Sequence, residues 1–186
     1  MFERFRRERA KARANRAIIE RLFATIADAA RRPAHYTVHG VADSVMGRYA
    51  MLALHVRLFQ HRARGASPAL EAMAQDVVDM LFREIDSTLR EIGIGDTSVP
   101  KRMKKLARMV YGRWRSYGEA LAENDRAALT EAVRRNVYAE GGDPGGAAAL
   151  ADYAVRADAA LREQSDDAFL SGRIAFPEPV RASEAA

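Results

Sequence analysis

The chain has 186 residues, of which 48% are hydrophobic and 30% charged, proportions that fit one globular domain with a core of its own. It contains no cysteine, which excludes disulfides, zinc knuckles, iron–sulfur ligation and thiol nucleophiles and fits a reducing compartment. The longest unbroken apolar run, residues 49–54, is far shorter than the roughly 20 residues of a membrane-spanning helix. We expect a cytoplasmic protein, with peripheral contact at the inner face of the cytoplasmic membrane as an alternative.

The positive charge is concentrated at the N-terminus. Residues 1–32 hold ten Arg or Lys and four acidic residues, a local balance of +6 against +5 for the whole chain. Such an arm is typical of contact with an anionic surface, which can be RNA, DNA or phospholipid headgroups. A solvated, fraying helix start is the other interpretation. The candidate membrane or ribosome contacts are Arg4, Arg6, Arg7, Arg9, Lys11 and Arg13.

Apolar residues at helical spacing predict an all-α fold, a compact single-domain bundle of about six or seven helices. The first helix is expected over residues 3–31, with Pro33 as its stop. Residues 35–40 lack helical periodicity, and we predict a loop there. The next helix is capped by Asp43 or Ser44 and is apolar around most of its circumference. That helix should be central.

Four further helices and a short last one are expected after the central helix. Ser67 caps one that ends at Gly93, and Pro100 marks the start of another near residue 99. Asn124 or Asp125 caps the next, which the glycine-rich run 141–146 ends, and the last two are residues 147–163 and a short one after Ser165. The expected organisation is a basic N-terminal amphipathic helix over residues 1–34, a helical domain over 35–172 and a mobile, poorly packed tail over 173–186.

The sequence offers no convincing catalytic or metal-binding constellation. His35 and His39 are four residues apart but lie in the non-helical stretch, so a metal site is not expected. His55 and His61 fall on different faces of one helix, which predicts one packing and one surface histidine. The glycine run follows a helix and lacks the Lys-Ser or Lys-Thr ending of a phosphate loop. We predict no catalytic residue, no cofactor, no metal and no small-molecule substrate.

One segment, residues 86–117, is dense in polar groups of segregated charge. Acidic residues precede a helix that carries seven Lys or Arg and no acid between positions 101 and 115. Surface ion pairs between two solvated helices, worth about 0–1 kcal/mol each, are one explanation. A partner-binding surface is the other, because Gly112 lies between aromatic residues and permits close approach of another helix. The candidate partner-binding residues are Asp86, Glu91, Asp96, Lys101, Lys104, Lys105, Arg108, Tyr111, Arg113 and Trp114.

The same segment, LREIGIGDTSVPKRMKKLARMVYGRWRSY, carries a resemblance to a known family. Together with DVVDMLFREID before it and the helix GRYAMLALHVRLFQHR, it resembles the ubiquinol-cytochrome c chaperone family over roughly residues 36–140. The resemblance implies an all-helical, non-enzymatic assembly factor of the respiratory chain. Such a chaperone binds newly made cytochrome b as its client and promotes assembly of the cytochrome bc1 complex (complex III). It also implies a small partner protein and contact with the ribosome, as in mitochondrial members.

The residues leave two alternative functions: a nucleic-acid binder and, ranked after it, a small-molecule enzyme whose only candidate groups lie between Asp96 and Lys105. A helical nucleic-acid-binding or ribosome-associated protein would use the basic arm together with the basic helix after Pro100.

Overall fold

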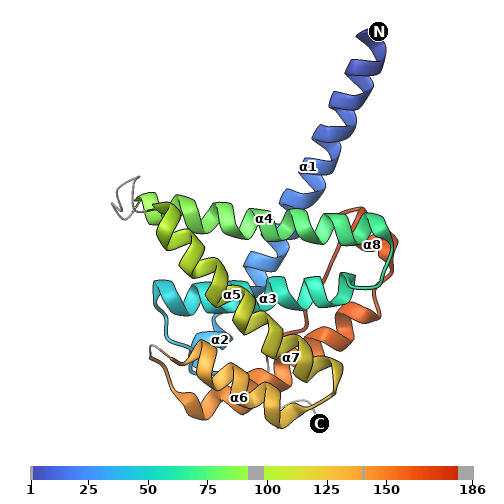
Figure 1. Cartoon of the computed structure of the whole chain (residues 1–186). Helices are drawn as coiled ribbons and strands as arrows, with labels where there is room; N and C mark the ends of the chain where they lie inside the picture. Colours follow the sequence, from blue (N-terminus) through green and yellow to red (C-terminus); the bar gives the residue numbers. More distant parts are fainter. Residues whose placement is uncertain (1, 92–98, 140, 180–186) are drawn as a thin grey trace.

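The computed structural model describes residues 2–91, 99–139 and 141–179 (Figure 1). It confirms the all-α fold class. The elements are α1 (Phe2–Ala30), α2 (Ala34–Thr37), α3 (Val45–Ala63), α4 (Pro68–Glu91), α5 (Val99–Ala122), α6 (Arg126–Val137), η1 (Pro144–Gly146), α7 (Ala147–Arg162) and α8 (Asp166–Leu170). Within these ranges there is no strand, and a single isolated bridge joins Val41 and Gly142. None of the helices in the described ranges is long and apolar enough to cross a bilayer.

Helix α3 is the centre of the bundle, as its apolar circumference predicts. Every residue from 51 to 59 is buried, and α3 packs against α1, α4, α5 and α7. A helix that is hydrophobic on all sides needs neighbours on all sides, which explains this arrangement. Its N-terminus is fixed by Ser44, whose Oγ accepts a hydrogen bond from the Gly47 amide at 3.1 Å.

Helix α1 belongs to the bundle only in its second half. Leu22 and Ile26 are fully buried, whereas Arg6, Arg9 and Arg13 are exposed. Figure 1 shows the N-terminal half of α1, in dark blue, rising out of the bundle. The predicted helix is confirmed, and its basic part projects away from the rest of the protein.

The prediction of a loop at residues 35–40 is wrong for residues 35–37, which belong to the short helix α2, and is confirmed for residues 38–40, which lie outside any helix. The amides of Tyr36 and Thr37 donate to the carbonyl of Pro33 at 2.9 and 3.0 Å. Proline can open a helix because its missing N–H would have no intrahelical acceptor there. A single turn of helix is too short to produce a periodic hydrophobic pattern, so the sequence pattern could not reveal it.

The glycine-rich run after α6 packs against His39 and Gly40, the residues that follow α2 in the sequence. The amide of Asp143 donates to the Gly40 carbonyl at 2.8 Å, and the hydroxyl of Tyr138 donates to the His39 carbonyl at 2.6 Å. A side chain at Gly146 would overlap the backbone of His39. The glycines thus end α6, as predicted, and also allow two backbones to lie in contact.

Residues 173–179 pack on the bundle, contrary to the expectation of a poorly packed tail. Phe176 is buried, and the guanidinium of Arg32 donates to the carbonyls of Phe176 at 3.2 Å and Pro177 at 2.6 Å. An aromatic side chain and one well-placed arginine therefore hold a segment that has no regular secondary structure. Residues 180–186 lie outside the described ranges.

Candidate partner-binding surface

The predicted charge segment divides between α4, α5 and residues outside the description. Asp96 lies in the stretch 92–98, which is not described, and the side chains of Glu91, Lys101 and Lys105 are not described either. Asp86 lies on α4 and accepts a hydrogen bond from Arg90 Nε on the same helix at 2.8 Å. Asp86 and Arg90 therefore form an ion pair between positions four residues apart on α4.

Helix α5 has a buried side and an exposed, mainly cationic side. Val110, Trp114 and Tyr117 are buried against the centre of the bundle, where α5 crosses in front of α3 (Figure 1). The outward side is a row of exposed residues at helical spacing, which we call the outer face of α5. It consists of Lys104, Arg108, Tyr111, Gly112, Arg115 and Glu119.

Tyr111 is an exposed aromatic side chain with a fixed environment. It is 49% exposed, yet its ring centroid lies 5.7 Å from that of Phe82 on α4 and 5.6 Å from that of Trp114. Aromatic pairs at these separations attract each other beyond the area that they bury. The ring is therefore held in place while much of it remains accessible.

The cations of the outer face have few partners within the protein. Among the described residues, neither Lys104 nor Arg108 forms an ion pair, and Arg108 Nε donates to the carbonyl of Lys104 at 3.4 Å. Arg115 lies 3.9 Å from Glu119, with both side chains largely exposed. Ion pairs of this kind contribute little to stability. The outer face therefore carries a net positive charge that folding does not require.

Trp114, one of the partner-binding candidates, lies in the core of the bundle. It is 3% exposed, its Nε1 donates to the Ala53 carbonyl at 2.9 Å, and its own carbonyl accepts a bond from Arg57 Nε at 3.0 Å. Its place in the apolar stripe of α5 directs the indole to α3. Arg113 is half-buried at the edge of this contact region.

The two glycines of α5 have different surroundings. A Cβ at Gly118 would overlap the guanidinium of Arg57, which is buried between α3 and α5. Gly112 is exposed, and a Cβ there would meet no atom within 4 Å. The first glycine thus leaves room for the buried Arg57 side chain between α3 and α5. The second is not required by any neighbour in the described part of the chain.

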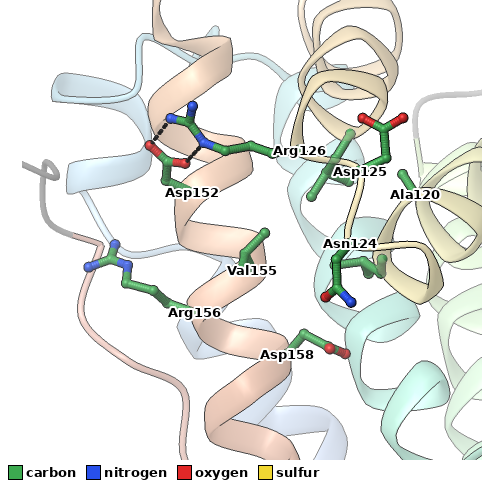
Figure 2. A pocket seen from close by; sticks show the side chains of 10 residues that line it. Ala120, Asn124, Asp125, Arg126, Asp152, Val155, Arg156 and Asp158 are labelled. Carbon is green, nitrogen blue, oxygen red and sulfur yellow. Dashed lines mark hydrogen bonds and ion pairs between the residues drawn. The ribbon is translucent and has the colours of Figure 1, made fainter.

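A hollow that the sequence did not predict lies between α5, α6 and α7 (Figure 2). Its volume is about 540 Å³, and Leu121, Leu129 and the 42% exposed Val155 form part of its lining. At its rim the guanidinium of Arg126 contacts both carboxylate oxygens of Asp152, with Nη2 donating to Oδ2 at 2.6 Å. The lining comes from three helices, so no local sequence pattern could have predicted this hollow.

Asp158, below the same hollow, is held in an ion-pair network. His61 Nδ1 lies 2.7 Å from its Oδ1, and Arg162 Nε donates to its Oδ2 at 2.8 Å. Burial disfavours the charged carboxylate, but these hydrogen bonds hold the pKa of Asp158 below its usual value. The His61 side chain is only 7% exposed, so the expectation of a surface histidine is wrong. Its carboxylate partner lies on α7, far away in the sequence.

Three fully buried histidines form a cluster with Tyr153. His35 Nε2 donates to the Ala29 carbonyl at 3.1 Å, so its Nδ1 is the acceptor in the 3.2 Å contact with His39 Nδ1. His55 Nδ1 donates to the Met51 carbonyl at 2.8 Å, and its Nε2 therefore accepts from the hydroxyl of Tyr153 at 2.8 Å. With this assignment His35 and His55 each have the hydrogen-bonding pattern of a neutral imidazole.

Burial explains why His35 and His55 are neutral. It is the main cause that lowers the pKa of His35 to about 2 and that of His55 to about 4. Within the described ranges no group of three or more His, Cys, Asp or Glu is arranged to hold a metal ion. The sequence reasoning missed the cluster because its members are far apart in the sequence: His35 lies on α2, His39 just after it, His55 on α3 and Tyr153 on α7.

The basic arm contributes a separate charged surface. Arg6, Arg9 and Arg13 are exposed along the projecting half of α1, while the side chains of Arg4, Arg7 and Lys11 lie outside the description. Arg16 lies next on the helix and pairs with Glu20 at 2.8 Å.

The helical bundle has the fold of a solved protein. The crystal structure of the Cbp3 homolog from Brucella abortus is 44% identical in sequence, covers 96% of this chain and 98% of its own, and superposes with a TM-score of 0.86. The chain itself belongs to the ubiquinol-cytochrome C chaperone family, whose profile matches residues 37–176. No curated protein matches the chain. Neither match indicates a nucleic-acid-binding protein, so that alternative has no support.

Proposed function

We propose that this protein is an assembly chaperone that binds newly made cytochrome b and promotes its assembly into the cytochrome bc1 complex, without catalytic turnover. The observation that carries the proposal is the family match over residues 37–176, which includes every element of the bundle from α3 to α8. The 44% identity to the Cbp3 homolog, over nearly the full length of both chains, supports it.

The outer face of α5 is the surface that we propose for partner binding. Exposed cations beside an anchored aromatic ring can hold a protein segment through charge and apolar contact at once. Lys104, Arg108 and Tyr111 have described, exposed side chains on this face. Lys101 and Lys105 remain candidates on the same helix.

The projecting half of α1 suits a cytoplasmic protein that works at the inner face of the membrane. Anionic lipid attracts surface-adjacent Lys and Arg by about 1 kcal/mol each, and exposed arginines at positions 6, 9 and 13 follow one another along the helix. Replacing these three with Gln should weaken co-sedimentation with anionic vesicles and leave the weak binding to neutral vesicles unchanged. Equal binding of the wild-type protein and the triple Gln variant to anionic vesicles would contradict this role.

A deletion strain tests the proposed function. It should lose the cytochrome bc1 complex and retain the other respiratory complexes, and the full-length gene should restore the loss. The levels of cytochrome b and of an unrelated oxidase, measured by haem spectra and immunoblotting of membranes, provide the comparison. Normal cytochrome b and normal bc1 complex in the deletion strain would overturn the proposal.

A further inference from the structure

We infer that the outer face of α5 binds an α-helical segment of a partner protein that carries carboxylates, and that this helix crosses α5 at Gly112. The inference deepens the proposed function, on which it rests for the existence of a protein partner. It adds the chemistry of the bound segment and the place of closest contact.

The first observation is that Gly112 is a glycine inside a long helix with no reason for it in the described protein. Glycine destabilises a helix interior by about 0.5–1 kcal/mol relative to alanine. No packing contact in the described protein offsets this cost, because a Cβ at position 112 would lie in open space. A glycine inside a helix permits close approach of another backbone.

The position of Gly112 on the helix strengthens this reading. Residues 104, 108 and 112 are separated by steps of four, which is one of the ridges by which helices pack on each other. Lys104 and Arg108 form the side chains of that ridge, and Gly112 interrupts it. The result is a notch in an exposed ridge, with cations on one side of it and Arg115 beside it.

The second observation is the charge of the face. Lys104 and Arg108 have no carboxylate partner among the described residues, and only Arg115 has one, the exposed Glu119 at 3.9 Å. Carboxylates on the bound segment would pair with these cations, and such pairing speeds association and sets the orientation of a partner. The exposed part of Tyr111 supplies an apolar contact next to the charges.

Two other occupants fit less well. A second copy of this chain would place the same cationic face against itself, and like charges repel. RNA would use the cations, but phosphate contacts gain nothing from a missing side chain at position 112. A helix gains both from the notch and from the charges.

Site-specific photo-crosslinking in the full-length chain tests the inference. The variant Tyr111→p-benzoylphenylalanine, expressed in the deletion strain, places a crosslinker of similar shape on the outer face. It is combined with Gly112→Leu, which fills the notch with a good helix former, or with Ala122→Leu, which adds the same side chain at an exposed position farther along α5. Thermal unfolding checks that all three proteins are folded.

The expected result is an adduct with a protein segment of helical sequence that bears carboxylates, mapped by mass spectrometry. The adduct should be lost in the Gly112→Leu background and kept in the Ala122→Leu background. An adduct with RNA or with a second copy of this chain, no adduct at all, or an adduct that survives Gly112→Leu would overturn the inference. The deletion phenotype is measured separately, so failure of the proposed function is distinguishable from failure of this one.

Discussion

The two sides of α5 carry the same kinds of residue under different constraints. On the inner side, Gly118 makes room for the buried Arg57, and Trp114 bonds to the backbone of α3. On the outer side, Gly112 faces open space and Arg108 has no carboxylate partner among the described residues. The inner residues are explained by folding, and the outer ones are not. This difference is the reason for assigning the outer face to a partner.

Acid is expected to have the largest effect, and to act on the interior alone. His35 and His55 have folded pKa values of about 2 and 4 against 6.5 in the unfolded chain, so unfolding takes up protons below pH 6.5. Stability should be complete above that pH and decrease as the pH falls toward 4. His55 alone should contribute on the order of 3 kcal/mol.

Urea unfolding at pH 7.5, 5.5 and 4.5 measures this loss. The variant His55→Gln keeps a neutral hydrogen-bonding side chain and should flatten the decrease. Asp158 is an acid whose pKa is lowered in the folded protein. The stabilisation that it contributes is therefore present at neutral pH and is lost only when the pH falls below the ordinary carboxyl pKa of 3.8. A stability that is constant from pH 7.5 to 4.5 would show that the histidines are not buried and neutral.

A matched pair of alanine substitutions should separate the two sides of α5 next. Gly118→Ala forces the guanidinium of Arg57 to move from its bond with the Trp114 carbonyl. We expect a loss of about 2 kcal/mol in the free energy of unfolding, measured by urea denaturation at neutral pH. If the loss were negligible, the contact between Arg57 and α5 would not be the reason for the glycine.

The other half of the pair, Gly112→Ala, should have the smallest effect and the opposite sign. It should stabilise the protein by about 0.5–1 kcal/mol, because alanine is the better helix former and meets no neighbour. The same denaturation experiment applies. Destabilisation would mean that residue 112 is constrained by the fold itself, and the two sides of α5 would no longer differ.

Much of the fold could be predicted because it is encoded locally. Ser44, Asp125 and Ser165 cap their helices through side-chain bonds to nearby amides. Residue type and spacing predicted Ser165 and narrowed each of the other two caps to a pair of neighbouring residues. The apolar stripe through Val110, Trp114 and Tyr117 also indicated which side of α5 is buried. The place of Trp114 in that stripe predicted that its indole is buried.

What could not be predicted depends on contacts between distant parts of the chain. The bond from Tyr153 to His55 joins α7 to α3 across 98 positions, and the bond from Tyr138 to the His39 carbonyl spans 99. Neither has a local signature. The packing of Phe176 likewise depends on Arg32, at the other end of the sequence. On α5, the sequence showed that the charges were segregated, and the structure showed which of them are exposed.

Co-purification tests the proposal that the outer face of α5 binds cytochrome b. The tagged full-length chain should recover newly made cytochrome b from detergent-solubilised cells. The double variant Lys104→Glu with Arg108→Glu should no longer recover cytochrome b. The control variant Arg31→Glu with Arg64→Glu makes an equal charge change at exposed positions outside α5, and it should still recover cytochrome b. All three proteins should unfold at similar urea concentrations, since exposed charges contribute little. Absence of cytochrome b from the wild-type preparation, or equal recovery by both variants, would contradict this proposal.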